Sequence, residues 1–260
     1  MKSARSLLGA CKAGKQKLGV HISGGDPQMT EMIGNIGIDF FWIDTEHSMI
    51  DKAALLGHLI AARAADVPAF VRIAWNDRVL AKPILDAGVQ GMIFPMVNSA
   101  KEAEDAVKAC LYPPDGVRGF GPGRAIDFGL TPIDEYIKEG HKDVLTIVQI
   151  ETREAVECVD EIAAVPGLDI VAVGPGDLSG AFGKLNRIYD TEIQKIFAYV
   201  IARAHAADKP VLISSIPYDK ANIKMWMDLG ADMITAGGDY SFIMNGAATV
   251  KSNFSQLLAE

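Results

Sequence analysis

Short apolar segments alternate with helical patterns along the whole chain, and this alternation limits the fold more than any other feature. Eight segments have the length and composition of buried strands and are bounded by Gly, Pro, Asn or Asp. They are residues 18–23, 39–44, 69–73, 91–97, 144–151, 169–174, 210–214 and 232–236. The stretches between them have Ala, Leu, Ile, Glu and Lys at helical spacing, among them residues 52–65, 79–87, 100–111, 153–164 and 192–207. Eight strand-then-helix units in a row predict an α/β fold with a parallel sheet.

Strand composition and a repeated turn favour a closed barrel over an open sheet. Residues 91–97 and 170–173 are almost continuously apolar, as in strands that are covered on both faces. Four segments begin with a helix-ending glycine two residues before an acid or amide, at residues 37–39, 88–90, 167–169 and 230–232. This repeat continues through the middle of the chain, where a domain boundary would interrupt it. We therefore predict one (β/α)8 TIM barrel domain over residues 1–260 rather than a doubly wound sheet.

Charge and composition exclude several classes of partner. The chain has 25 Lys and Arg against 33 Asp and Glu, a net charge of −8, without a basic run that would attract nucleic acid or an anionic membrane. It has no apolar stretch long enough to span a membrane, and residues 1–10 have too short an apolar run for a signal peptide. Three widely spaced cysteines do not indicate a disulfide framework or a thiolate metal site. We expect a cytoplasmic protein that acts on a small molecule.

Polar residues follow several of the predicted strands, where the barrel fold places reacting groups. Glu151 and Asp177 end neighbouring strands, and two carboxylates supply the oxygen ligands that Mg²⁺, Mn²⁺ or a similar ion prefers. Each acid also has a simpler explanation, Glu151 as an acid at a helix N-terminus and Asp177 as a cap of its own turn. Because Arg72 and His47 fall at the same rim, we favour a metal site.

Arg72 and His47 have the chemistry for proton transfer beside a carbonyl. His47 lies just past a strand end, where an imidazole can accept or donate a proton, although a solvated loop histidine is the simpler interpretation. Arg72 ends an apolar strand, and its burial requires a carboxylate, an enolate or a substrate as partner. A salt bridge to Asp44 or Glu46 would satisfy it equally well. The role of His21, the remaining histidine near a strand end, stays open.

Other chemistries lack their residues. A Schiff-base aldolase needs a lysine on a strand, and the predicted strands contain none, with Lys184 in a loop as the nearest candidate. The glycines of residues 119–123 do not join a strand to a helix, and no phosphate-binding P-loop sequence is present. Residues 112–130 form a long Gly-rich connection that we expect to be a lid or binding loop. The residues together predict a metal-assisted enzyme that removes a proton next to a carbonyl of a small acid.

Five sequence phrases in order carry a family resemblance. They are FWIDTEH at residues 41–47, VRIAWND at 71–77, YPPDGVRG at 112–119, VQIETREA at 148–155 and GPGDLS at 174–179. At these residues the chain resembles the HpcH/HpaI-type class II pyruvate aldolases, which act on 4-hydroxy-2-oxoheptanedioate or 2-dehydro-3-deoxyglucarate. The resemblance covers nearly the whole chain and implies a phosphoenolpyruvate/pyruvate-type barrel. It implies reversible cleavage of a 4-hydroxy-2-oxo acid to pyruvate and an aldehyde through a pyruvate enolate, with Mg²⁺, Mn²⁺ or Co²⁺ as cofactor.

The resemblance also implies a role for each matching residue. It makes Glu151 and Asp177 the metal ligands, Arg72 the group that polarises the keto oxygen, and Gln149 part of the pyruvate site. The segment Gly174, Pro175, Gly176 and Asp177 would bind the pyruvate carboxylate through the backbone N–H groups of its last two residues. His47, paired with Asp86, would be the acid/base for the aldol hydroxyl, and Asp44 and Glu46 would support metal-bound waters.

Some features depart from the family pattern and leave the aldehyde open. Thr45 and Gly176 stand where the family often has Gly and Ala, and the family often has an aromatic residue near the position of His21. The loop over residues 121–125 also differs from that of the best-known members. The resemblance further implies a homohexamer, a trimer of dimers that exchange a C-terminal helix over residues 240–258. Two alternatives remain: citrate-synthase-like or acyl-CoA lyase chemistry on the same barrel, and a barrel that binds a small acid without turnover.

Overall fold

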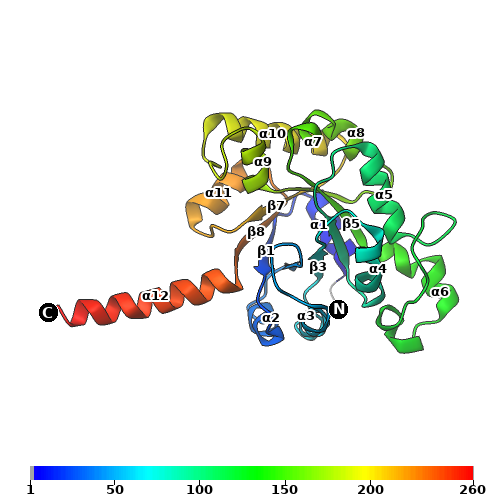
Figure 1. Cartoon of the computed structure of the whole chain (residues 1–260), viewed down its shortest axis with the longest axis horizontal. Helices are drawn as coiled ribbons and strands as arrows, with labels where there is room; N and C mark the ends of the chain where they lie inside the picture. The colour runs from blue at the N-terminus through cyan, green and yellow to red at the C-terminus, as the bar shows by residue number, and fades with distance from the viewer. Residues whose placement is uncertain (1–2, 260) are drawn as a thin grey trace.

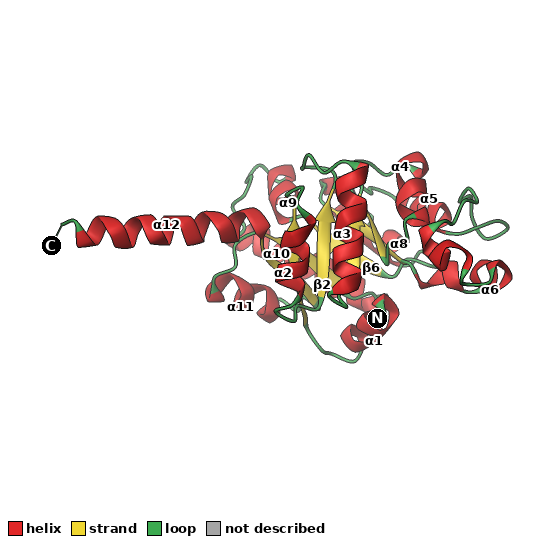
Figure 2. Ribbon diagram, turned by 90° about the horizontal axis from the view of Figure 1, so that it is seen from below, coloured by secondary structure: helices red, strands yellow, loops and turns green. Residues whose placement is uncertain are grey.

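Eight parallel strands pair in chain order, and β8 closes onto β1 to form a barrel. The computed structural model describes residues 3–259, so Met1, Lys2 and Glu260, which belong to the predicted domain, lie outside the described residues. Figure 1 shows helices around the outside of the barrel, and Figure 2 shows α2 and α3 lying against it. The prediction of a (β/α)8 TIM barrel is confirmed.

Every predicted strand overlaps one in the structure. The strands are β1 (Lys17–Ile22), β2 (Phe40–Asp44), β3 (Ala69–Arg72), β4 (Gly91–Phe94), β5 (Leu145–Ile150), β6 (Ile170–Val173), β7 (Val211–Ser215) and β8 (Met233–Gly238). The structure begins β1 at Lys17, so one strand does contain a lysine. Its ammonium pairs with Asp39 at 3.0 Å, at the amino end of the barrel and away from the reacting groups of a barrel enzyme.

The helices follow the predicted pattern, with additions. They are α1 (Ala4–Lys12), α2 (Pro27–Gly34), α3 (Lys52–Ala64), α4 (Arg78–Asp86), α5 (Ala100–Cys110), α6 (Ile133–Lys138), α7 (Arg153–Glu157), α8 (Val159–Ala163), α9 (Pro175–Ala181), α10 (Thr191–Ala206), α11 (Lys220–Asp228) and α12 (Asp239–Leu257), with 3₁₀ turns η1 (Arg124–Gly129) and η2 (Gly140–Asp143). The helix predicted over residues 153–164 is broken at Cys158 into α7 and α8. Within residues 3–259, no helix combines the length and apolar character of a membrane span.

Alternation along the strands separates two apolar cores. On β2, Phe40 and Trp42 belong to the core inside the barrel, whereas Phe41 and Ile43 pack toward the surrounding helices. Helix α1, which the sequence analysis did not identify, adds Ala4, Leu7, Leu8 and Cys11 to the inner core. The lower part of the barrel interior is therefore filled with apolar side chains, and polar groups are confined to the carboxyl ends of the strands.

Helix α12 extends away from the barrel (Figures 1 and 2). Asp239 is its only buried residue. Large apolar side chains are exposed along its length, namely Tyr240, Ile243, Met244, Val250, Phe254 and Leu257. A helix with this much exposed apolar surface lacks, within its own chain, the packing that normally stabilises a helix.

The long connection over residues 112–130 lies at the amino ends of the strands. It joins α5 to β5, and its Arg124 donates to the backbone oxygen of Ala87, just before β4, at 2.7 Å. Residues 112–130 therefore do not cover the carboxyl ends of the strands in their own chain, and a role as a lid or binding loop stays a prediction. A segment that leads from a helix into the next strand lies at the amino ends of the strands, whereas the reacting groups of a barrel enzyme lie at the carboxyl ends.

Candidate active site

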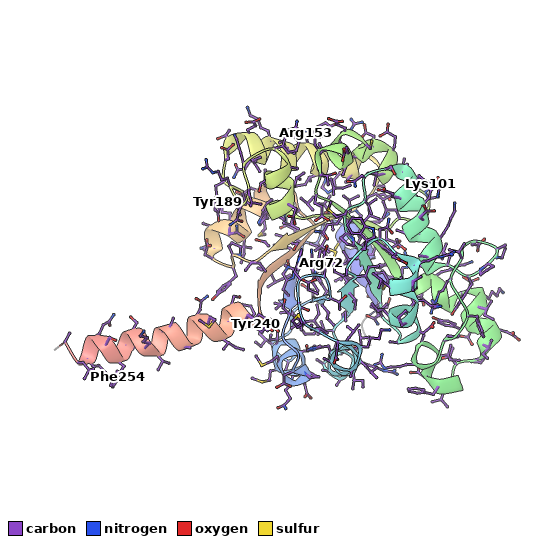
Figure 3. The ribbon with its side chains drawn as sticks, in the orientation of Figure 1. Arg72, Lys101, Arg153, Tyr189, Tyr240 and Phe254 are labelled. Atoms are coloured by element: carbon purple, nitrogen blue, oxygen red, sulfur yellow. The ribbon has the colours of Figure 1, made fainter. Side chains whose placement is uncertain are left out.

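A cavity of about 370 Å³ opens at the carboxyl ends of the strands. Most predicted site residues line it: Asp44, His47, Arg72, Gln149, Gly174, Pro175, Gly176 and Asp177. Glu46 and Glu151 contact this wall through Arg72 and Gln149, and Figure 3 places Arg72 in the middle of the barrel. The structure thus brings together all the predicted site residues except Asp86.

Arg72 is held by two carboxylates. Its Nε and Nη2 donate to Oδ1 and Oδ2 of Asp44 at 3.0 and 2.7 Å, and its Nη1 lies 2.9 Å from Oε2 of Glu46. Both salt bridges that the sequence allowed as alternatives are formed, and Arg72 still faces the cavity. Burial would raise the pKa of Asp44, but hydrogen bonds from Arg72, its charge and two backbone N–H groups outweigh burial and lower that pKa. The pair is therefore ionised at neutral pH.

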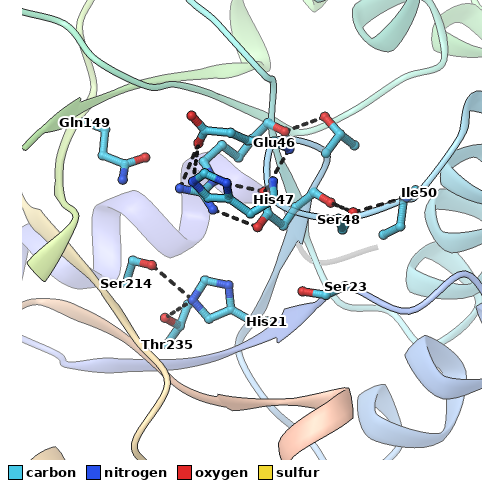
Figure 4. A network of polar contacts seen from close by, with 12 residues as sticks. His21, Ser23, Glu46, His47, Ser48, Ile50, Gln149, Ser214 and Thr235 are labelled. Carbon is cyan, nitrogen blue, oxygen red and sulfur yellow. Dashed lines mark hydrogen bonds and ion pairs between the residues drawn. The ribbon is translucent and has the colours of Figure 1, made fainter. Parts of the chain in front are cut away.

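The loop after β2 is folded around Asp44. Oδ1 of Asp44 accepts hydrogen bonds from the backbone N–H groups of Glu46 at 3.0 Å and of His47 at 3.4 Å. The Thr45 hydroxyl donates to the backbone oxygen of Arg72 at 2.6 Å, and Ser48 donates to that of Asp44. These contacts, drawn in part in Figure 4, place the imidazole of His47 at the rim, with its Nε2 3.9 Å from Oε2 of Glu46. The side chain of His47 is 65% exposed and free to meet a substrate.

Glu151 is buried beneath the cavity. Its Oε1 accepts from the backbone N–H of Met96 at 2.7 Å, and its Oε2 accepts from Nε2 of Gln149 at 2.5 Å. Burial raises the pKa of Glu151 to about 7 against the hydrogen bond from Met96, and the charge of Glu46 adds to the rise. Gly174 lies so close that an added Cβ would be 2.6 Å from both Gln149 and Glu151, so only glycine leaves room for this pair.

The donor set fits a hard divalent cation. No group of three or more His, Cys, Asp or Glu within the described part of the chain is arranged to hold a metal. An ion such as Mg²⁺ does not need one, because it is held by one or two carboxylates and completes its shell with water and substrate oxygens. The charges of Glu46 and Asp177 both raise the pKa of Glu151, so three carboxylates act on the same region. A cation held by Glu151 and Asp177 would relieve this repulsion.

Asp86 does not reach His47 of its own chain. It is the last residue of α4 and lies beside the amino ends of β3 and β4, where it pairs with Arg118 at 3.2 Å. His47 follows the carboxyl end of β2, at the other end of the barrel. The predicted His47–Asp86 pair is therefore not formed within the chain, because a helix after a strand runs back toward the amino end.

Sequence reasoning did not assign a role to several polar groups beside the cavity. Met96, whose φ of 53° is rare for a residue with a side chain, supplies an N–H to Glu151. Thr235 and Ser214 surround the imidazole of His21 inside the barrel. The signal available for these inner residues was the alternation of each strand, which turns His21, Ser214 and Thr235 inward.

Comparison with known proteins agrees with this geometry. The model of the HpcH/HpaI aldolase/citrate lyase family matches residues 17–246. This chain belongs to that family. A hydroxypyruvate/pyruvate aldolase of Agrobacterium fabrum is 32% identical over 94% of this chain and 91% of that protein. A 4-hydroxy-2-oxo-heptane-1,7-dioate aldolase of Salmonella arizonae is 33% identical over 94% of this chain and 92% of that protein.

A crystal structure of an HpcH/HpaI aldolase/citrate lyase family protein from Burkholderia cenocepacia superposes with a TM-score of 0.89. The two chains are 29% identical, over 96% of this chain and 99% of that one. The resemblance seen in the sequence is confirmed, and with it the prediction of a carbon–carbon lyase of the aldolase type.

Proposed function

We propose that this enzyme is a divalent-metal-dependent aldolase that reversibly cleaves a 4-hydroxy-2-oxo acid into pyruvate and an aldehyde. The observation that carries the proposal is one cavity lined by a paired, ionised Arg72, by Gln149 and by Asp177, with Glu151 hydrogen-bonded to Gln149. These are the parts that enolate formation requires: an anchor for the acid, a charge for the developing oxygen, and carboxylates for a cation.

Arg72 and Gln149 would orient the oxo acid. A guanidinium has five N–H donors, and the contacts to Asp44 and Glu46 leave N–H groups on Nη1 and Nη2 for the keto oxygen. Oε1 of Gln149 is buried and has no hydrogen-bond partner among the described residues, so Gln149 has an acceptor that the protein does not satisfy. Gly176 and Asp177 line the same cavity, and their backbone N–H groups would receive the carboxylate of the substrate.

A bound Mg²⁺, Mn²⁺ or Co²⁺, held by Glu151 and Asp177, would supply Lewis acidity at the keto group. His47, exposed at the rim, would remove the proton of the aldol hydroxyl during cleavage and return it during addition. Asp44 keeps Arg72 and the loop of His47 in place, and Glu46 lies between those two side chains. Arg72 offsets the negative charge that develops when the carbon–carbon bond breaks and the pyruvate enolate forms.

Assembly would complete the enzyme. The exposed apolar face of α12 supports packing of this helix on a neighbouring subunit. We propose that the assembly is a homohexamer, a trimer of dimers. In such an assembly Asp86 and residues 112–130 would act at the site of another subunit, because they lie at the amino end of the barrel in their own chain. Location in the cytoplasm stays a prediction from composition.

Pyruvate release tests the proposal. Purified enzyme with Mg²⁺, Mn²⁺ or Co²⁺ is given 4-hydroxy-2-oxo acids, and pyruvate is followed by its reduction with lactate dehydrogenase. We expect metal-dependent release that EDTA abolishes. Turnover of oxaloacetate or a CoA thioester without any pyruvate activity would instead support the citrate-synthase-like or lyase alternative. Binding of oxo acids without turnover would support a binding barrel.

A further inference from the structure

His21 is built into the wall of the cavity through one of its two ring nitrogens. It faces the barrel interior from β1 and is 4% exposed. Its Nε2 lies 2.8 Å from the hydroxyl oxygen of Thr235 and 3.2 Å from that of Ser214. Thr235 is itself fixed, because its oxygen accepts from the backbone N–H of Ser215 at 3.0 Å. The orientation of the ring is therefore determined by β7 and β8.

The other nitrogen, Nδ1, has no hydrogen-bond partner among residues 3–259. Figure 4 shows the ring with Nε2 directed to Ser214 and Thr235, and with Ser23 beyond its opposite side. His21 and Ser23 both line the cavity. A polar ring atom at a cavity wall that the protein itself does not satisfy is a binding group for a ligand.

The imidazole is neutral, which decides what it can bind. Burial lowers the pKa of His21 to about 3, and the positive charge of Arg72 adds to this effect. A neutral Nδ1 either donates or accepts one hydrogen bond, depending on which nitrogen has the proton. A hydroxyl group matches both tautomers because it can donate and accept. An ionised carboxylate matches only one of them.

His21 lines the same cavity as Arg72, and both contact Trp42. Its ring centroid is 5.2 Å from that of Trp42, and the guanidinium carbon of Arg72 lies 5.3 Å from a Trp42 ring centroid. The two side chains thus flank one indole. A group bound at Nδ1 would lie in the same cavity as the keto oxygen that Arg72 binds in the proposed reaction.

We propose that His21 determines substrate choice by hydrogen-bonding a hydroxyl group of the substrate through Nδ1. The inference rests on the proposed aldolase function and adds a substrate class to it, that of hydroxylated substrates. The hydroxyl belongs either to the oxo acid or to the aldehyde. A histidine that served only to fill the barrel would affect stability without changing the preference between substrates.

The test uses two matched substrate pairs. The donors are pyruvate and 3-hydroxypyruvate, and the acceptors are acetaldehyde and glycolaldehyde. The value of kcat/KM is measured for all four combinations with the wild type, His21→Phe, His21→Asn and a control, His205→Phe. His205 is exposed on α10 and pairs with Asp232 away from the cavity. Exchange of the pyruvate methyl protons in D₂O is recorded for every variant, so that loss of the aldolase function itself is seen separately.

We expect His21→Phe to lower kcat/KM about 10-fold or more for hydroxylated substrates and less than about 3-fold for the others. A loss confined to 3-hydroxypyruvate assigns the hydroxyl to the donor, and one confined to glycolaldehyde assigns it to the acceptor. His21→Asn, which keeps a hydrogen-bonding group, should recover part of the preference, and it carries the test if the Phe variant does not fold. An equal loss for all four combinations, or an unchanged preference in a folded variant that still exchanges protons, overturns the proposal.

Discussion

Arg72 and Asp44 form two parallel hydrogen bonds, from Nε to Oδ1 at 3.0 Å and from Nη2 to Oδ2 at 2.7 Å. This arrangement uses the planar guanidinium as a fork, and Arg72 still lines the cavity. The carboxylate therefore fixes the direction in which Arg72 can act on a substrate. Register pairing of Asp44 with Arg72 on adjacent strands makes the contact a direct consequence of the barrel.

Replacing Arg72 by Lys should lower the rate of pyruvate proton exchange by about 100-fold or more. An ammonium keeps the charge but cannot contact Asp44 at two points and present a donor to the substrate. The measurement is the exchange rate at saturating pyruvate, with circular dichroism to verify the fold. Arg203→Lys, at an exposed pair with Asp160, is the matched control and should be unchanged. A normal rate in Arg72→Lys would make Arg72 structural.

Replacing Glu151 by Gln, or Asp177 by Asn, should abolish metal-dependent turnover and leave the fold intact. Each change removes one of two proposed ligands and preserves the shape of the side chain. Binding of Mn²⁺, followed by calorimetry, should weaken about 10-fold or more. Glu161→Gln on the exposed face of α8 is the control. Retained metal-dependent activity in either site variant would contradict the assignment.

Stability of the metal-free enzyme should depend on pH through Glu151. The pKa of this carboxyl is about 7 in the folded chain against an ordinary value of 4.5, so the folded state binds its proton more tightly. The ionised carboxylate therefore destabilises the fold: the cost is absent below about pH 4.5, grows as the pH rises toward 7, and is complete above 7.

This dependence is measured as the difference in thermal midpoint between the wild type and Glu151→Gln in EDTA, from pH 5 to pH 8. We expect the wild type to lose on the order of 5 °C relative to the variant as the pH rises. Added Mg²⁺ should reduce the difference at pH 8 by binding the ionised form. A difference that does not vary with pH would show that Glu151 titrates normally.

Charges placed on α12 should reduce the size of the assembly. Phe254→Asp with Leu257→Asp puts two carboxylates on an apolar face that is exposed within one chain. The mass from light scattering should fall below that of the wild type, whereas the control Asn253→Asp on the same helix should leave it unchanged. The barrel should keep its circular dichroism in both. An unaltered mass in the double variant would show that α12 does not hold subunits together.

Periodicity explains how much of the fold could be predicted. The strand Ile170–Val173 is apolar on both of its faces. This pattern is typical of a strand inside an α/β fold and can be recognised without knowing its distant contacts. Helix α1 was not predicted because its apolar residues are buried only by contact with the apolar side chains inside the barrel, and the sequence does not show this contact. The break at Cys158, where φ is −102° and ψ is 13°, has no glycine or proline to announce it in the sequence.

Site residues at the ends of strands could be predicted from the sequence. Contacts between side chains that are far apart in the sequence could not. Arg72 and Glu151 lie at the carboxyl ends of β3 and β5, so the fold itself brings them to one cavity. The pairing of His47 with Asp86 is not formed within one chain, because Asp86 ends α4 at the amino end of the barrel and His47 follows the carboxyl end of β2. His21 stayed ambiguous since a single histidine in an apolar strand looks the same whether it is core or ligand.

Exchange of the pyruvate methyl protons in D₂O, followed by NMR with Mg²⁺, Mn²⁺ or Co²⁺ and with EDTA, tests the central claim most directly. It detects enolate formation without requiring the aldehyde to be known. We predict exchange that depends on the added metal and disappears in Asp177→Ala. The absence of exchange with every metal, in folded wild-type enzyme, would contradict a pyruvate aldolase.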